Sequence, residues 1–306
     1  MKLSRRRALT IAAATGAAML APGNLAGEAI FTWTGTALGA DARITIAGLS
    51  RGEAALAVEL ARSEVERLEG AFSLYRPESE LSRLNRDGHL DHPSQDFRQL
   101  LGRSLAASEQ TLGFFNPAIQ PMWAFLARHF AGGSRDEPDP AEMKRILDRC
   151  DPSRISTSPS RIEIAPGMAL TFNGIAQGYV TDAVARIFES HGLRNILINL
   201  GEILALPGRC WDIAVAGGNR HLALSDRAAA QSAGRGTVFT PDGRWHHLID
   251  PSTGQSANHF ASVTATAASA TEADFLSTAL YAAKRPQHHE ILGNFPGAIV
   301  YLKENS

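Results

Sequence analysis

The chain has 306 residues, of which 44% are hydrophobic and 20% are charged, with 30 basic and 31 acidic residues and a net charge of −1. Such a composition is typical of a globular protein with one large core or two intimate lobes, and the absence of a basic block argues against binding to nucleic acid. The two cysteines, Cys150 and Cys210, are too few for a disulfide framework and lack the spacing of a zinc site, although they could pair in an oxidising compartment.

The N-terminus has the pattern of an export signal. Residues 4–9 read Ser-Arg-Arg-Arg-Ala-Leu, and an uncharged stretch follows from Thr10 to Ala21. This stretch is shorter than the roughly twenty apolar residues of a membrane-spanning helix, which favours a signal over a membrane anchor or an ordinary basic N-terminus. The Ser-Arg-Arg-x-x-Leu pattern is typical of the twin-arginine type. We therefore predict a signal at residues 1–29, a mature domain at 30–306 and a periplasmic location.

In the rest of the chain, hydrophobic periodicity predicts interleaved helices and strands. In chain order these are a strand at 44–46, a helix at 51–69 that stops at Gly70, a helix capped by Ser94 that ends at Gly113, a turn-rich loop at 131–138, a helix at 141–149 capped by Asp139, a helix at 179–190 closed by Gly192, and strands at 196–198, 211–215 and 262–266. Hairpin-like spacing in the C-terminal half argues against a purely parallel sheet. The predicted fold class is α+β, with mixed, largely antiparallel sheets and packed helices in a single compact domain of two intimate lobes.

Residues 269–283 carry the most informative motif. A serine and a glutamate at capping-box spacing predict a helix that begins here. Asp274 and Thr278 lie four residues apart on one face of it, and oxygen ligands of this kind suit a hard cation such as Mg²⁺, which often accompanies a phosphate substrate. The alternative is that both side chains simply face solvent. Residues 273–283 contain no Lys, Glu or Gln, however, and this favours a face that packs against something.

Two further segments could complete a site with this helix. Residues 173–178 read Asn-Gly-Ile-Ala-Gln-Gly directly before the predicted helix, where free backbone N–H groups and the helix dipole favour a diphosphate. The alternative is an ordinary turn. Residues 247–254 read His-Leu-Ile-Asp-Pro-Ser-Thr-Gly. Imidazole titrates near neutral pH, so His247 is a candidate for proton transfer, although it could instead only brace the turn at Asp250.

Seven motifs in conserved order resemble those of the flavin transferases of the ApbE/NosX type, and they extend across nearly the whole mature chain. They are Thr-Gly-Thr at 34–36, Phe-Ser-Leu-Tyr at 72–75 with Ser79 and Asn85 after it, Phe-Phe-Asn-Pro at 114–117 with Trp123, Thr-Phe-Asn-Gly-Ile-Ala-Gln-Gly-Tyr at 171–179, Asn-Leu-Gly-Glu at 199–202, the segment 247–254, and Ala-Asp-Phe-Leu-Ser-Thr at 273–278.

The resemblance implies an enzyme that takes FAD as substrate and, with Mg²⁺, transfers FMN to a threonine hydroxyl of an acceptor flavoprotein, releasing AMP. It assigns the metal to Asp274, Thr278 and the carbonyl of Gly174, and chemistry to Asp274 and His247. Residues expected around FAD, with Tyr75 against the flavin ring, are Thr34, Tyr75, Phe114, Phe115, Asn116, Thr171, Gln177 and Leu248. His246 and the pair His288 and His289 match nothing, and we expect them to face solvent.

The chain departs from the family pattern at Thr171, Asn173 and Gln177, where the family usually has Asp, Gly and Lys or Glu, and at Glu202, where it has a second glycine. These changes resemble the branch associated with nitrous oxide reductase maturation, and the export signal suggests a membrane-bound acceptor with a periplasm-facing flavin domain. Three alternatives stay open: a periplasmic enzyme that hydrolyses FAD, a non-catalytic flavin-binding assembly factor, and an exported protein without a ligand.

Overall fold

The structure is a computed structural model that describes residues 29–134, 136–216 and 219–305. The predicted export signal, apart from residue 29, lies outside the described residues. Within the described parts of the chain, no helix is both long enough and apolar enough to span a bilayer.

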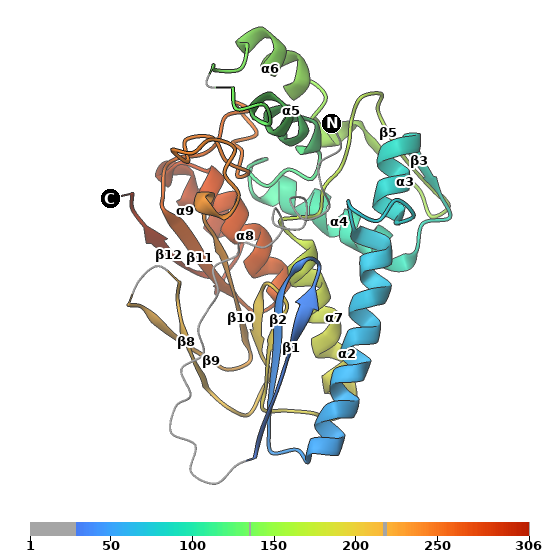
Figure 1. Cartoon of the computed structure of the whole chain (residues 1–306), viewed down its shortest axis with the longest axis vertical. Coiled ribbons are helices and arrows are strands. Elements are labelled where there is room, and N and C mark those ends of the chain that lie inside the picture. Colours follow the sequence, from blue (N-terminus) through green and yellow to red (C-terminus); the bar gives the residue numbers. More distant parts are fainter. Residues whose placement is uncertain (1–28, 135, 217–218, 306) are drawn as a thin grey trace.

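The first strand alternates exposed and half-buried residues, the second alternates buried and exposed residues over its first four positions, and together they begin a seven-stranded sheet (Figure 1). In spatial order the strands are β1 (Ile30–Ala37), β2 (Ala40–Ala47), β6 (Ile196–Asn199), β7 (Ile203–Ala205), β10 (Arg227–Ser232), β11 (Ser262–Ala267) and β12 (Ile299–Lys303). Each neighbouring pair is antiparallel, and the longest connection leads from β2 to β6, where Arg43 pairs with Asn199. The smaller sheets are β3 (His89–Asp91) with β5 (Arg161–Ile164) and β4 (Ile155–Thr157), and β8 (Trp211–Ala214) with β9 (His221–Leu224).

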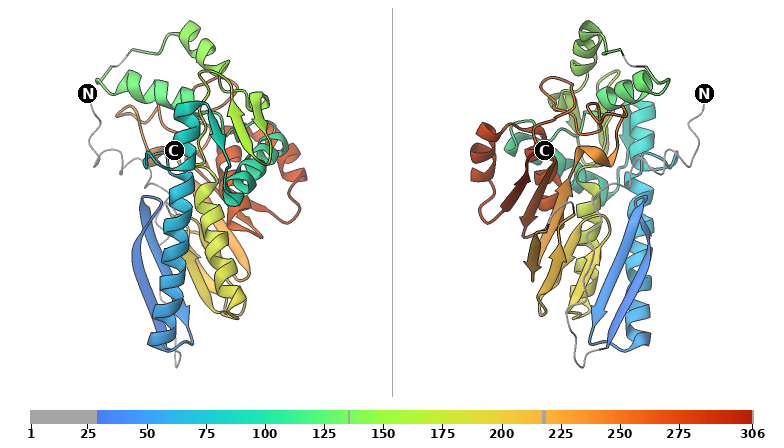
Figure 2. Two further views of the ribbon diagram at one scale, coloured as in Figure 1. Left: turned by 90° about the vertical axis from the view of Figure 1, so that its right-hand side faces the viewer. Right: turned by 60° about the vertical axis from the view of Figure 1, so that its left-hand side comes forward.

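Both faces of the large sheet are covered. Helices α2 (Arg51–Phe72), α7 (Ala176–Ser190) and α8 (Ala270–Ala282) pack on one face and enclose the main core, to which β2 contributes Ile44 and Ile46 (Figure 2). The β8–β9 hairpin covers the other face, where Trp211 packs with Ala47 and Leu197. Because residues of one strand alternate between faces, β2 contributes to both cores.

The remaining helices lie beyond one end of the sheet or at its margin. They are α3 (Glu80–Asp87), α4 (Gln95–Gln110), α5 (Gln120–Phe130), α6 (Pro140–Leu147) and α9 (Arg285–Gly293). Helices α5 and α6 form a separate apolar cluster, in which Met122 and Met143 pack with Trp245 and Ile249 from the loop before β11. The predicted α+β fold with antiparallel sheets is confirmed.

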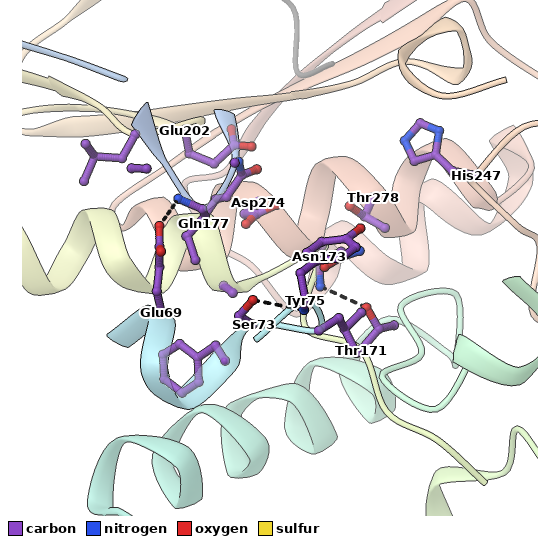
Figure 3. A pocket seen from close by; sticks show the side chains of 18 of the residues that line it. Glu69, Ser73, Tyr75, Thr171, Asn173, Gln177, Glu202, His247, Asp274 and Thr278 are labelled. Atoms are coloured by element: carbon purple, nitrogen blue, oxygen red, sulfur yellow. Dashed lines mark hydrogen bonds between the residues drawn. The ribbon is translucent and has the colours of Figure 1, made fainter. Parts of the chain in front are cut away.

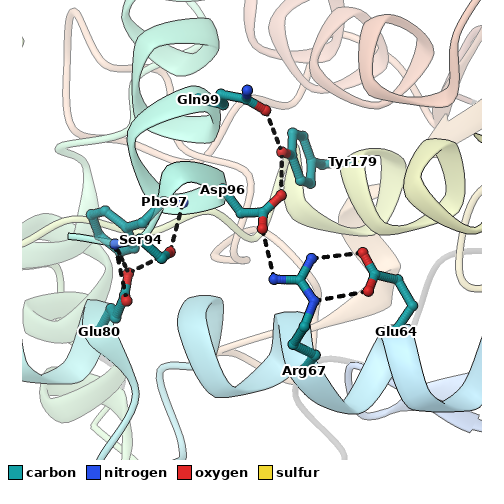
Figure 4. A network of polar contacts seen from close by, with 8 residues as sticks. All are labelled: Glu64, Arg67, Glu80, Ser94, Asp96, Phe97, Gln99 and Tyr179. Carbon is teal, nitrogen blue, oxygen red and sulfur yellow. Dashed lines mark hydrogen bonds and ion pairs between the residues drawn. The ribbon is translucent and has the colours of Figure 1, made fainter.

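A polar network fixes the first turn of α7 against α2 and α4 (Figure 4). The Tyr179 hydroxyl lies 2.9 Å from the Asp96 carboxylate and 3.1 Å from the side-chain oxygen of Gln99. Arg67 binds the same aspartate at 2.7 Å and also pairs with Glu64. Burial and the neighbouring Asp96 carboxylate raise the pKa of Tyr179 to about 12, so the phenol stays protonated and can donate.

Several local predictions are confirmed and others are wrong in detail. Ser94, Asp139 and Ser269 cap helices as predicted. Helix α2 does not stop at Gly70 but continues to Phe72, because a helical glycine costs only about 1 kcal/mol and the extra turn buries an aromatic side chain. Helix α7 begins at Ala176, three residues before the predicted start at residue 179. Both cysteines are free: Cys150 is buried and Cys210 is exposed.

Candidate active site

A cavity of about 1090 Å³ lies where the end of the β1–β2 hairpin meets the ends of α2 and α7 and one side of α8. Its wall joins segments that are far apart in sequence. Eleven predicted site residues line it, namely Tyr75, Phe114, Phe115, Asn116, Thr171, Gly174, Gln177, His247, Leu248, Asp274 and Thr278. A pocket of this size and mixed lining is suited to a nucleotide-sized ligand.

Thr34 is the predicted residue that the fold does not bring to this cavity. It is exposed on β1, and Trp33, Thr36 and Ala37 line the wall instead. Thr34 and Thr36 lie on the same side of β1, but Thr36 is two residues closer to the hairpin turn and so reaches the cavity. Next to that turn, the backbone N–H of Leu38 donates to Glu69 of α2 at 2.6 Å, which ties the hairpin to the cavity wall.

The two helices that carry the central residues touch without a side chain between them. A Cβ atom at Gly178 of α7 would lie 2.3 Å from the carbonyl oxygen of Ala270, so only glycine permits this approach. The Gly178 N–H donates to the Asp274 carboxylate at 3.0 Å. Asp182, one turn further along α7, accepts from the N–H groups of Ala270 at 2.8 Å and Thr271 at 3.0 Å. The start of α7 therefore fixes the position of Asp274.

Two buried carboxyl groups face each other across this junction. Asp274 is 3% exposed and Glu202, between β6 and β7, is 2% exposed. Burial raises the pKa of Asp274 to about 7, partly offset by the Gly178 N–H. Burial and then the charge of Asp274 raise the pKa of Glu202 well above its usual range. Neither carboxyl forms an ion pair with a described cationic side chain, so the site favours a proton or a bound cation.

The oxygen groups next to Asp274 fit Mg²⁺. Thr278 and Gly174 are neighbours, because a Cβ atom at residue 174 would lie 3.0 Å from the Thr278 hydroxyl oxygen. Ser232 lies 3.4 Å from the same oxygen. Across the described residues, no group of three or more His, Cys, Asp or Glu side chains is placed to hold a metal, so a cation here would need hydroxyl and backbone oxygens. A buried carboxylate, a hydroxyl and a backbone carbonyl are oxygen ligands that suit a hard cation.

The burial of Asp274 also decides between the two interpretations of its helix. A solvent-facing side chain would be exposed, whereas this one lies inside the cavity wall (Figure 3). Thr278 is less buried than Asp274 and lines the same cavity. The absence of long charged side chains from this helix thus reflects packing against α7 and the sheet.

The departures from the family motifs meet in one place. Gln177 is buried, and its side chain passes over Gly201, where a Cβ atom would lie 2.4 Å from the Gln177 amide nitrogen. Thr171 accepts a hydrogen bond from the Asn173 N–H at 3.2 Å, which shapes the turn before α7 (Figure 3). Glu202, another departure from the family pattern, also lies in the cavity wall. Its position directly after a strand end is the sequence signal for this role.

His247 is held as a neutral ring. Its Nδ1 atom lies 3.1 Å from the Thr237 carbonyl oxygen, which can only accept, so Nδ1 carries the proton and Nε2 is the basic atom. Burial, and then the neighbouring His246, lower the pKa of His247 to about 4. The Asp250 carboxylate accepts from Ser252 rather than from the histidine. The observed contacts thus give no support to a role for His247 as a brace of the Asp250 turn.

Two of the other histidines were placed wrongly from sequence. His246 is 1% exposed, and its Nδ1 accepts from the Leu248 N–H at 3.2 Å. His288 is also buried, with Nε2 lying 2.8 Å from the Leu280 carbonyl oxygen. Only His289 faces solvent as expected. Both buried rings form hydrogen bonds with buried backbone groups, and the sequence alone does not indicate these bonds.

Comparison with known proteins identifies the family. The sequence profile of the ApbE family matches residues 38–302. The chain belongs to the ApbE family. Among ApbE relatives, a protein of Treponema pallidum named FAD:protein FMN transferase is 30% identical over 229 residues, which are 65% of this chain and 62% of that protein. The chain thus spans less than two thirds of that relative's length. A Klebsiella pneumoniae protein of the same name is 28% identical over 235 residues, covering 71% of this chain and 72% of its own.

Solved ApbE structures have the same fold. The flavin transferase ApbE from Vibrio cholerae superposes with a TM-score of 0.75 at 21% identity, over 91% of this chain and 94% of that one. The flavinyl transferase ApbE from Pseudomonas stutzeri superposes with a TM-score of 0.77 at 22% identity, over 93% and 94%. At these identities the likeness concerns the fold, and it confirms the α+β architecture expected from sequence.

Proposed function

We propose that this ApbE-family chain is a FAD:protein FMN transferase that moves FMN from FAD to a threonine hydroxyl of an acceptor flavoprotein and releases AMP. The observation that carries the proposal is the buried Asp274 carboxyl beside Thr278 and Gly174 in the wall of a nucleotide-sized cavity. Curated relatives named for this transfer support the same reaction.

The residues present fit Mg²⁺ as the cofactor. Asp274, Thr278 and the backbone of Gly174 would hold it, and a bound ion would neutralise the charge of the FAD diphosphate. The positive end of the α7 helix dipole favours negative charge at the same place. Tyr75, which is 46% exposed at the cavity wall, offers an aromatic face to the flavin ring.

In the proposed reaction the acceptor threonine oxygen attacks the phosphorus on the FMN side of the diphosphate. A new P–O bond forms to threonine, the P–O bond to AMP breaks, and FMN remains as a phosphoester. His247 would accept the threonine proton at Nε2, because Nδ1 carries the ring proton that faces the Thr237 carbonyl oxygen and the ring is neutral across the physiological range. Positioning and charge neutralisation supply most of the catalysis in such transfers.

The location and the acceptor are part of the proposal. The sequence of residues 1–29 supports export by the twin-arginine route, which would place the transfer in the periplasm. A membrane-bound acceptor with a periplasm-facing flavin domain would then be the natural partner. The residues at 171, 173 and 177 support a link to nitrous oxide reductase maturation through the resemblance described above.

The test is AMP release from FAD by the mature protein with Mg²⁺, with and without a threonine-bearing flavoprotein acceptor, together with in-gel flavin fluorescence of that acceptor. AMP that appears only with acceptor, alongside a fluorescent acceptor band, supports the transferase. AMP in both reactions indicates a hydrolase. FAD binding without AMP indicates an assembly factor, the alternative favoured by Thr171 and Gln177.

One variant tests the site itself. Asp274→Ala should abolish acceptor labelling, because the buried carboxylate is the only charged member of the proposed ligand set, while far-UV circular dichroism stays unchanged. Asp41→Ala, at an exposed position on β2, is the matched control and should label the acceptor normally. Normal labelling by Asp274→Ala with Mg²⁺ would show that the site is assigned wrongly.

A further inference from the structure

A second cavity, of about 910 Å³, lies next to the first, between α3, α5 and α6. The two cavities share part of their walls, since Leu74, Pro77 and Gln120 line both. Tyr75 lies between two of these shared residues in sequence and lines the first cavity. Anything bound in the second cavity therefore lies beside the first.

Arginines dominate the lining of this second cavity. Arg86 comes from α3, Arg128 from α5, Arg145 from α6 and Arg149 from just after α6, and the only acidic lining residue is Glu142. We call this surface the arginine cleft. Its charge is a local feature, because the whole chain has a net charge of −1.

Three of these arginines have no ionic partner. Arg86 pairs with Asp87, but Arg128, Arg145 and Arg149 form no ion pair with any described acidic residue. Unpaired guanidinium groups on a concave surface concentrate positive potential and attract anions.

The cleft is also shaped by its backbone. Gly167 lines it with a φ of +77°, and a Cβ atom there would lie 3.1 Å from Cδ of Arg149. Glycine thus lets the Arg149 stem lie close to the chain. The four guanidinium-bearing residues are exposed and come from three separate helical segments. That spread suits a ligand with several negative groups along its length better than a single small anion, which could not bind arginines on separate helices at once.

We propose that the arginine cleft docks an acidic segment of the acceptor protein, next to the hydroxyl that receives FMN. The inference rests on the proposed function, because it requires a polypeptide substrate at the opening of the FAD cavity. Charged groups around such an opening mainly control the rate of association and the choice of partner. The cleft would thereby select acceptors whose threonine lies among Asp and Glu residues.

The test uses the mature protein and a fluorescent peptide with a single threonine among glutamates, alongside a peptide with lysines in place of the glutamates. The test variant is Arg128→Glu with Arg145→Glu, neither of which lines the FAD cavity. The control is Arg51→Glu with Arg194→Glu, two exposed arginines outside both cavities. Fluorescence anisotropy gives the peptide Kd, and quenching of flavin fluorescence gives the FAD Kd.

We expect wild type to bind the acidic peptide and not the basic one, with a Kd that rises steeply with salt. The cleft variant should weaken peptide binding by about tenfold or more, while its FAD Kd and the peptide Kd of the control stay near wild type. Equal binding by wild type and cleft variant, or no binding by wild type, would overturn the proposal. A rise in the FAD Kd instead, or stronger binding of phosphatidylglycerol vesicles than of peptide, would also overturn it.

The two proposals fail in different ways. Peptide binding that depends on the cleft, without AMP release for any acceptor, would refute the transferase and leave a docking surface. Normal transfer to a protein acceptor by the cleft variant, with an unchanged acceptor KM, would refute docking and leave the transferase.

Discussion

Replacing Gly178 by alanine tests whether the contact between α7 and α8 holds the site together. The added Cβ would lie 2.3 Å from the Ala270 carbonyl oxygen, 2.6 Å from its carbonyl carbon and 2.7 Å from the Thr271 Cα. All three are backbone atoms, and Asp182 holds that backbone through two hydrogen bonds. No side chain can rotate away, so the helices must separate.

The expected loss of stability is large for a single methyl group. Overpacking of a core costs typically 1–3 kcal/mol, and the upper end applies where backbone must move. Separation of the helices would also weaken the 3.0 Å bond from the Gly178 N–H to Asp274. A total of about 3 kcal/mol corresponds to a Tm lower by roughly 6–12 °C. Acceptor labelling should fall as well, because Asp274 loses its position.

The assay is thermal unfolding of the mature protein followed by circular dichroism, with Gly102→Ala as the matched control. Gly102 lies inside α4 with no atom within 4 Å of an added Cβ, so its replacement should stabilise the protein by about 0.5–1 kcal/mol. If Gly178→Ala melts at or above the wild-type temperature and labels the acceptor normally, the contact between α7 and α8 does not hold Asp274 in place.

Two further predictions concern the same junction. Without metal, burial raises the pKa of Asp274 to about 7, above its value in the unfolded chain. The folded state is therefore stabilised by the protonated carboxyl below about pH 4, and this stabilisation is lost as the pH rises toward 7. Mg²⁺ competes with that proton, so the rise in Tm with Mg²⁺ should grow between about pH 5 and pH 8, and equal rises at both would contradict the metal assignment. Asp182→Asn removes one of two acceptors at the start of α8 and should cost about 2 kcal/mol in urea unfolding. A loss within error would show that the carboxylate is not needed there.

Features with a local cause could be predicted from the sequence. The caps at Ser94, Asp139 and Ser269 are decided within a few residues, because each side chain binds the backbone of its own helix. Asp274 and Thr278 lie on the same face of α8 because residues four apart do so in any α-helix. The antiparallel sheets followed from hairpin spacing. The wider cavity lining was assembled by resemblance to known flavin transferases rather than by spacing.

Features that depend on packing between distant segments could not be predicted. Helix α2 passes Gly70 because Phe72 finds a place in the core. His246 is buried because its ring packs against Tyr281, with the ring centroids 5.9 Å apart, and accepts a hydrogen bond from the Leu248 N–H. Hydrophobic periodicity indicates neither contact. Glu202 lies in the same cavity wall as Asp274 because β6 and β7 pack against α7, and the start of α7 meets α8.

The pairing of β2 with β6 affects how the chain folds during its synthesis. Arg43 and Asn199 are neighbours in the sheet, yet everything from α2 to α7 is synthesised between them. The β1–β2 hairpin must keep one edge unpaired until residue 196 has left the ribosome, and such edges associate with other chains. Non-local pairing of this kind slows folding. The walls of the first cavity run from Trp33 to Ala282, so a nascent or truncated chain that lacks either of these segments lacks part of the proposed flavin site.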